Sequence, residues 1–201
     1  MPSKIIHKYQ ISRARATQFN QTLRHQGMAI WIDCLDLWNP KYNMARTLDE
    51  LVSICDDLRS AGVHAQVHLQ GTHRLENGQG TILDLVGAPG TILHATMVQY
   101  QYINLHAMTL ETLSIGSNRA SIHLRDVRIT GRVIIDAISV VLEECCLYDL
   151  DILFRSEEAS RLSVYYTTML RCRVITGNDC RKSIGTSNSL TDTVIKNAQS
   201  I

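Results

Sequence analysis

Apolar side chains in the second half of the chain fall into rows that repeat every 18 to 20 residues. The row that starts at Ile103 is followed by a row in which five of six positions stay apolar, with Arg132 as the exception, and then by a fully apolar row. A row of smaller side chains precedes these three, and a looser one follows. The five rows are Leu83, Leu85, Ala88, Gly90, Leu93 and Ala95; Ile103, Leu105, Met108, Leu110, Leu113 and Ile115; Ile122, Leu124, Val127, Ile129, Arg132 and Ile134; Val140, Leu142, Cys145, Leu147, Leu150 and Ile152; and Val164, Tyr166, Met169, Cys172, Val174 and Ile175.

A repeat of this length that keeps its apolar columns in register is typical of a parallel β-solenoid. Each turn of such a fold hydrogen-bonds only to the turns beside it, so side chains stack on equivalent positions. The pattern predicts a mainly β chain, with a right-handed parallel β-helix of four to five coils over residues 63–176. We expect Leu105, Leu124 and Leu142 to be buried in one vertical stack.

One helix is predicted ahead of the repeats. Thr47 and Glu50 have the spacing of a capping box, apolar residues then follow at helical intervals, and Gly62 ends the run. The apolar positions share one face of this helix. A solenoid needs its ends covered, and the helix at residues 47–61 stands where an N-terminal cap is required.

The patterns divide the chain into a basic arm with a lead-in strand (residues 1–46), the capping helix and β-helix (47–176) and a C-terminal tail (177–201). Residues 1–32 carry five Lys or Arg and no Asp or Glu, which fits either docking onto an acidic surface or a solvated lead-in. The apolar run at residues 29–35 predicts a strand. Within this tail, residues 191–201 offer only Val194, Ile195 and Ile201 as apolar anchors. We therefore expect the tail either to pack on a neighbouring subunit or to fold back over the last coil.

The stretch that leads into the repeats resembles the entry into the pectate-lyase-like right-handed β-helix superfamily, and in particular phage tailspikes. Residues 47–75 give a short helix, a strand and a Gly-Thr turn, and residues 80–93 give a coil rich in leucine and glycine. Gln70 stands where that superfamily often has proline, and His73 where it often has tyrosine. The resemblance covers residues 47–175. It implies a structural or attachment protein of a virion that works as a trimer.

A second repeat family remains open as an interpretation. Leu105, Leu110 and Ile115 recur every five residues, as in pentapeptide-repeat helices. Those helices prefer a small residue two positions earlier, whereas this chain has Ile103, Met108 and Leu113 there. Left-handed hexapeptide helices need an apolar residue every six positions, which the rows do not supply.

Composition narrows the range of partners. Twenty Lys or Arg against 19 Asp or Glu give a net charge of +1, so nucleic acid is not an expected partner. No apolar run reaches the length of a membrane span, and the N-terminus lacks the apolar core of a secretory signal. Six cysteines occur without a CxxC pair, so we interpret them as core residues of a chain made in a reducing cytoplasm and then associated with a virion.

Candidate chemistry rests on side chains that the register turns outward. His106, Arg125 and Glu143 form one outward column, and Asp126 and Glu144 form the next. With Arg128, the first column is the candidate binding site for a sugar. Clustered carboxylates with an arginine are also what polysaccharide-cleaving β-helices use, which makes Asp126, Glu143, Glu144 and Arg125 the alternative catalytic set. Outward ladders of opposite charge are equally common as surface stabilisers, at about 0.2–1 kcal/mol per pair.

The motifs of polygalacturonase-like enzymes do not occur, nor does a phosphate-binding loop, a dinucleotide fingerprint or a nucleophile elbow. No cofactor or metal is therefore expected. The sequence favours a non-enzymatic structural or attachment protein of a phage or phage-like particle, which binds a glycan or another receptor. The alternatives are a polysaccharide lyase or glycoside hydrolase, and a pentapeptide-type inhibitor of a DNA-processing enzyme, which requires a square coil and an acidic face.

Overall fold

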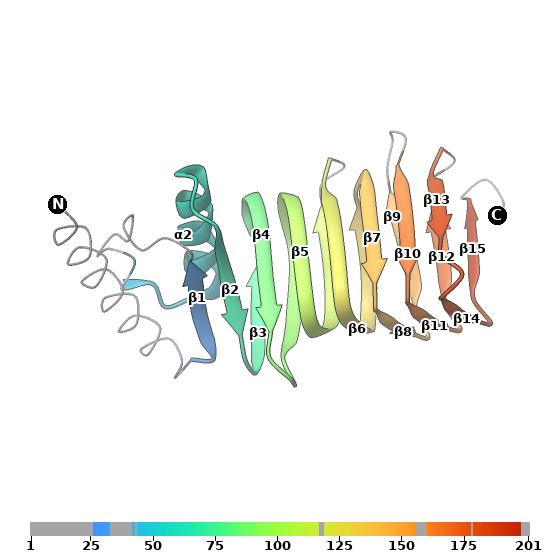
Figure 1. Cartoon of the computed structure of the whole chain (residues 1–201), viewed down its shortest axis with the longest axis horizontal. Coiled ribbons are helices and arrows are strands. Elements are labelled where there is room, and N and C mark those ends of the chain that lie inside the picture. Colours follow the sequence, from blue (N-terminus) through green and yellow to red (C-terminus); the bar gives the residue numbers. More distant parts are fainter. Residues whose placement is uncertain are drawn as a thin grey trace, which may run out of the picture.

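The fold was obtained as a computed structural model that describes residues 26–32, 42, 44–116, 119–155, 160–177 and 179–197. The strands stack along one long axis, with a single helix among the described residues at the N-terminal end (Figure 1). Most of the basic arm lies outside the described residues. The elements are β1 (Met28–Ile32), α2 (Leu48–Ser60), β2 (Ala65–Leu69), β3 (Thr72–Glu76), β4 (Gln79–Gly87), β5 (Ile92–Gly116), β6 (Ser121–Asp136), β7 (Ser139–Glu143), β8 (Cys146–Tyr148), β9 (Asp151–Arg155), β10 (Arg161–Tyr165), β11 (Thr168–Leu170), β12 (Arg173–Thr176), β13 (Arg181–Ile184), β14 (Ser189–Thr191) and β15 (Val194–Asn197).

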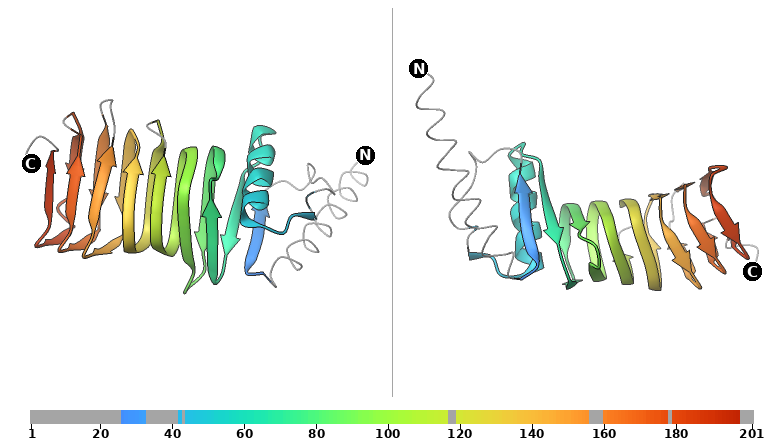
Figure 2. Two further views of the ribbon diagram at one scale, coloured as in Figure 1. Left: turned by 180° about the vertical axis from the view of Figure 1, so that it is seen from behind. Right: turned by 60° about the horizontal axis from the view of Figure 1, so that its bottom comes forward.

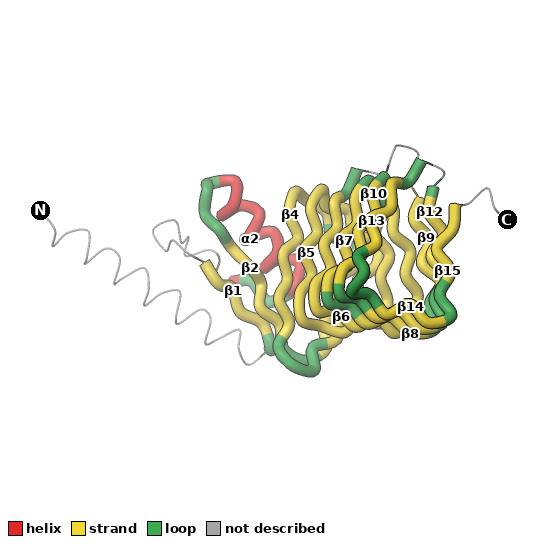
Figure 3. Tube along the Cα trace, turned by 45° about the vertical axis from the view of Figure 1, so that its right-hand side comes forward, coloured by secondary structure: helices red, strands yellow, loops and turns green. Residues whose placement is uncertain are grey.

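The chain forms a parallel β-solenoid of about six turns, which confirms the predicted fold class with a somewhat larger number of turns. A late turn has three strands, such as β7, β8 and β9, which lie on what we name the first, second and third faces. The next turn, β10–β12, pairs with it face by face in parallel register. The last turn, β13–β15, pairs in the same way with β10–β12. β5 and β6 instead run around the corners without a break (Figure 3).

The predicted leucine stack is confirmed. Leu105 pairs with Leu124 and Leu124 with Leu142 on the first face, and their exposures are 1%, 0% and 1%. Val164 continues the column in the next turn. Because each side chain is enclosed by the equivalent ones above and below it, the core is a continuous apolar column along the solenoid axis.

The predicted register is wrong on the third face, where it is one residue out. A register shift in the pairing of β5 with β6 adds one residue to β6, so Leu113 lies beside Val133 instead of Arg132. Val133 in turn pairs with Ile152. The extra residue is accommodated near Gly131, where a Cβ atom would collide with the carbonyl oxygen of Glu111. Arg132, the polar exception in the predicted row, therefore pairs with Thr112 and not with Leu113.

Two further positions differ from the predicted rows. Tyr166 is 65% exposed, because Val164 occupies the column of Leu142 and the whole row is displaced. Gly90 lies in a turn with φ of +83°, so it does not fill the column of Leu110. Parallel pairing also continues through β13–β15, so residues 181–197 extend the solenoid.

Left-handed backbone occurs at the corner before the second face in four successive turns, and at the corner before the third face in the last three turns. The corner before the second face has Ala107, Asp126, Glu144 and Tyr166 at φ of 50–57°, and the corner before the third face has Asp149, Arg171 and Asp192 at 48–55°. A residue in this conformation reverses the alternation of inward and outward side chains. The residue after it can then point into the core.

Those inward corner residues form hydrogen bonds inside the stack. The Thr167 hydroxyl donates to the Leu142 carbonyl of the preceding turn and accepts from the amide of Cys145. The Cys145 thiol donates to the Leu124 and Glu143 carbonyls. At the other corner, the Thr193 hydroxyl accepts from the Cys172 amide. Small polar side chains at corners therefore satisfy backbone groups that the bent chain cannot pair in a ladder.

Thiol reactivity tests this corner geometry. Burial raises the pKa of the Cys145 thiol to about 11, so at pH 8 it is neutral and shielded, whereas Cys146 points outward and is partly exposed. Because the thiolate is the reacting species, we expect iodoacetamide to label Cys146 at least tenfold faster. Tandem mass spectrometry after timed labelling distinguishes the two adjacent residues. Equal rates would show that the corner is misplaced.

The helix α2 covers the N-terminal end of the solenoid, as predicted (Figure 2). The Thr47–Glu50 capping box is present, and the apolar face of the helix is buried. Asp56 accepts hydrogen bonds from the amides of Thr81 and Ile82 in β4. Gly80 has no Cβ, which leaves room for this carboxylate beside the strand. β1 also lies at this end and pairs antiparallel with β2.

Candidate functional site

The predicted outward column on the first face is present. His106 pairs with Arg125, and Arg125 pairs with Glu143. Asp126 and Glu144 follow them at the corner, both in left-handed backbone and both exposed. The structure therefore brings together Arg125, Glu143 and Glu144 from the candidate catalytic set, with Asp126 beside them.

These charges form a surface ladder. Arg125 lies 3.5 Å from a Glu144 oxygen and 3.9 Å from a Glu143 oxygen, and His123 lies 3.0 Å from Glu143. Glu143 and Glu144 thus each have a cationic or hydrogen-bonding neighbour in the preceding turn. Partly exposed pairs of this kind contribute little to stability, but they hold both glutamates in defined positions.

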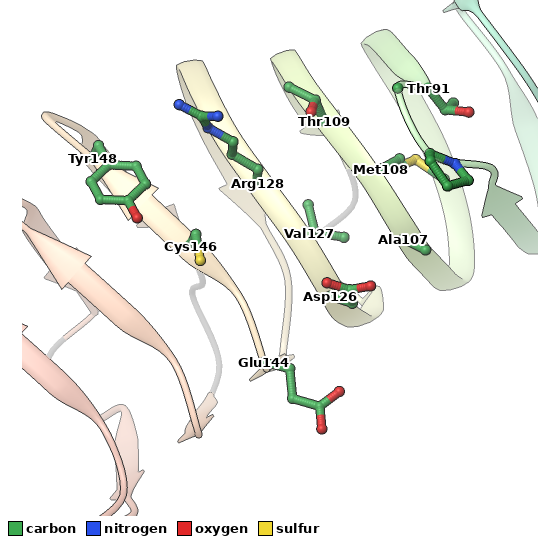
Figure 4. Close-up of a pocket in the computed structure, with 12 residues that line it drawn as sticks. Thr91, Ala107, Met108, Thr109, Asp126, Val127, Arg128, Glu144, Cys146 and Tyr148 are labelled. Atoms are coloured by element: carbon green, nitrogen blue, oxygen red, sulfur yellow. The ribbon is translucent and has the colours of Figure 1, made fainter.

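A groove opens on the second face beside that corner (Figure 4). Its volume is about 520 Å³, and its lining comes from four successive turns. Asp126, Arg128 and Glu144 from the sequence prediction line it, whereas His106, Arg125 and Glu143 lie outside its lining. The remaining lining residues are Pro89, Gly90, Thr91, Ala107, Met108, Thr109, Val127, Cys146 and Tyr148.

Tyr148 is the groove residue that sequence reasoning missed. The Arg128 guanidinium lies over its ring, 5.8 Å from the centroid, and the two side chains lie on neighbouring strands (Figure 4). This contact presents an aromatic face and a cation together. Tyr148 follows the inward Leu147, so strand alternation alone indicates an outward tyrosine beside Arg128.

None of the known families, curated proteins or solved structures compared with this chain matches it. The resemblance to tailspike-type helices therefore extends no further than the solenoid fold. What the groove can do has to be argued from its own side chains.

The two carboxylates of the groove come from adjacent turns, whose backbones are about 4.8 Å apart. In Figure 4 the Glu144 side chain extends away from the groove, and it does not point toward Asp126. Glu144 is also engaged by Arg125. An acid and a base that act on one bond must converge on it, and this pair diverges.

No group of three or more His, Cys, Asp or Glu suited to hold a metal ion occurs among the described residues. Within the same residues, no helix is long and apolar enough to cross a membrane.

Proposed function

We propose that this protein is a non-enzymatic attachment protein that binds a glycan in the groove of the second face, as a component of a phage or phage-like particle. The observation that carries the proposal is the groove itself, in which Tyr148 and Arg128 lie side by side and Asp126 and Thr109 lie within reach. A sugar ring offers an apolar face of C–H groups and a rim of hydroxyls. An exposed aromatic ring packs on the apolar face of the sugar. Carboxylate, guanidinium and hydroxyl groups form hydrogen bonds with the hydroxyls of the sugar.

The solenoid supports this use because its wall is rigid and periodic. Side chains on adjacent turns are spaced about 4.8 Å apart and held by parallel pairing above and below. A site built from strands is better preorganised than one built from loops. An extended polysaccharide that lies across the turns can contact Thr109, Arg128 and Tyr148 in succession, since these lie on consecutive strands.

The depolymerase alternative has less support. Of its three acidic groups, Asp126 and Glu144 diverge in the groove, and Glu143 lies outside the groove. Glu144 also forms an ion pair with Arg125. If the protein nevertheless cleaves polysaccharide, incubation with capsular and O-antigen preparations will release new reducing ends. The inhibitor alternative also has less support, because a late turn such as β7–β9 has three strands and not the four sides that a pentapeptide-type coil needs.

Tyr148→Ala should weaken glycan binding about tenfold or more, since losing a stacked ring costs on the order of 1.4 kcal/mol or more. The side chain is outward and partly exposed, so the fold should survive the change. A glycan array with the wild-type protein would identify the ligand, and biolayer interferometry would compare the variants.

Tyr102→Ala is the matched control, because Tyr102 is exposed on the first face and outside the groove. It should bind as the wild type does. Equal binding by Tyr148→Ala and the wild type would refute the proposed site, and an array with no bound glycan would refute the function.

A further inference from the structure

The third face has an outward apolar column, which is unusual for a position that faces solvent. Ile134, Leu153 and Ile175 pair with one another on β6, β9 and β12. All three are partly exposed. They border a hollow of about 780 Å³ whose lining also includes the charged residues described next.

Two columns of opposite charges run beside the apolar one. Asp151 accepts two hydrogen bonds from Arg173 of the next turn, at 3.1 and 2.6 Å. At the neighbouring corner, Asp149 accepts two from Arg171, at 2.5 and 2.8 Å. All four side chains are exposed by more than half. In each pair, a negative charge therefore stands one turn before a positive one, and at the corner Asp192 of the last turn follows Arg171.

This arrangement is complementary to itself under one kind of symmetry. Consider a dimer whose two-fold axis lies in the interface and runs parallel to the strands of the third face. The turns of the second copy then run in the opposite order, and each column of residues faces the same column of the other copy. If the axis passes between β9 and β12, Asp151 of one copy faces Arg173 of the other. The same operation sets Leu153 opposite Ile175.

Other symmetry axes do not bring the opposite charges of two third faces together. A two-fold axis parallel to the solenoid keeps residues at equal height and reverses the strand direction. Asp151 then faces Asp151, or Asp149 of the same turn if the axis passes between the two charged columns. A three-fold axis along the solenoid joins two different faces, so the self-complementarity of this one has no role. Isolated exposed ion pairs also add little to the stability of a monomer, whereas four charges in one network discriminate strongly between partner orientations.

We propose that the third face is the contact surface of a homodimer, in which two solenoids pack with antiparallel axes. On this face, residues 112–116 of β5 and the segments of β6, β9, β12 and β15 form a patch of roughly 20 by 15 Å. This is smaller than the ~800 Å² per partner of a standard interface. The dimer should accordingly be weak, with a dissociation constant in the micromolar range. The inference does not depend on the proposed glycan site, which lies on the second face.

Two charge-reversal variants, measured alone and as a mixture, test whether residue 151 of one copy faces residue 173 of the other. Asp151→Arg and Arg173→Asp each place like charges opposite each other in a homodimer, so each variant should be monomeric in sedimentation equilibrium from about 1 µM to about 500 µM. An equimolar mixture should dimerise again, since Arg at 151 then faces Asp at 173. Arg161→Asp, which makes the same change of charge as Arg173→Asp but on the first face of the same turn, should dimerise as the wild type does.

Circular dichroism and thermal melting establish that each variant is folded before its mass is measured, with reductant present throughout. A wild-type protein that is monomeric or trimeric over the whole range would overturn the proposal. So would a dimer that Asp151→Arg leaves intact, or single variants that do not recover when mixed.

Discussion

Replacing Leu124 with alanine is expected to lower the free energy of unfolding by about 2–5 kcal/mol. The side chain is fully buried and lies between Leu105 and Leu142 in the same column. Its removal leaves a cavity whose walls are held apart by parallel strands on both sides, so the site cannot collapse. Because the stability of a solenoid is approximately a sum over neighbouring turns, the loss weakens two interfaces. Urea denaturation followed by circular dichroism measures it.

Ile184→Ala provides the matched control, since Ile184 continues the same column in the last turn. It is 41% exposed and has a neighbouring turn on one side among the described residues, so we expect less than half the loss. Ser121→Ala, an outward change on the same strand as Leu124, should stay within about 0.5 kcal/mol. Losses of similar size for Leu124 and Ile184 would contradict the continuous core.

The first face could be predicted from the sequence over four turns, because its strands there keep a strict period of two. Leu105, Leu124 and Leu142 each stand two residues after another inward apolar residue. Any slip in register would expose the whole row. The capping helix was equally predictable, because Thr47 and Glu50 form a local motif that does not depend on the rest of the fold.

The third face could not be predicted, because a single extra residue reverses inward and outward positions without changing composition. Arg132 in an apolar row was the one signal of this, and Val133 beside it would have restored the pattern. The tyrosine at position 166 was misplaced for a related reason, since its left-handed backbone breaks the alternation on which the prediction relied.

The candidate site was predicted in part. Asp126, Glu144 and Arg128 do lie together on the groove, because the register of β6 with β7 and β8 follows from the repeat. The groove itself depends on where the corner bends, and outward residues carry no periodic signal that marks a corner. His106 and Glu143 therefore remain on the first face, around the corner from Tyr148.

The side chain of Arg59 secures the cap to the first two turns. Its guanidinium donates to the carbonyl of Ile82 at 2.7 Å and to that of Ala65, and lies 3.8 Å from Asp84. Arg59 and Asp84 are both nearly buried. The planar guanidinium reaches β2 and β4 together from one position on the helix, which a single ammonium group cannot do.

Arg59→Ala is accordingly expected to cost about 3–5 kcal/mol, because it leaves Asp84 as a charge with Gln66 as its remaining side-chain donor and removes the donors from two carbonyls. Arg59→Lys keeps the positive charge but lacks the planar guanidinium with its several donors. It should recover roughly half of the lost free energy of unfolding. Ser53→Ala, on the exposed side of the same helix, should change stability by no more than about 0.5 kcal/mol.

Native-state hydrogen exchange adds a spatial test, since the amides of α2 and β2 should lose protection before those of β6 and β7. Uniform loss of protection along the solenoid would mean that Arg59 does not act as the attachment point of the cap.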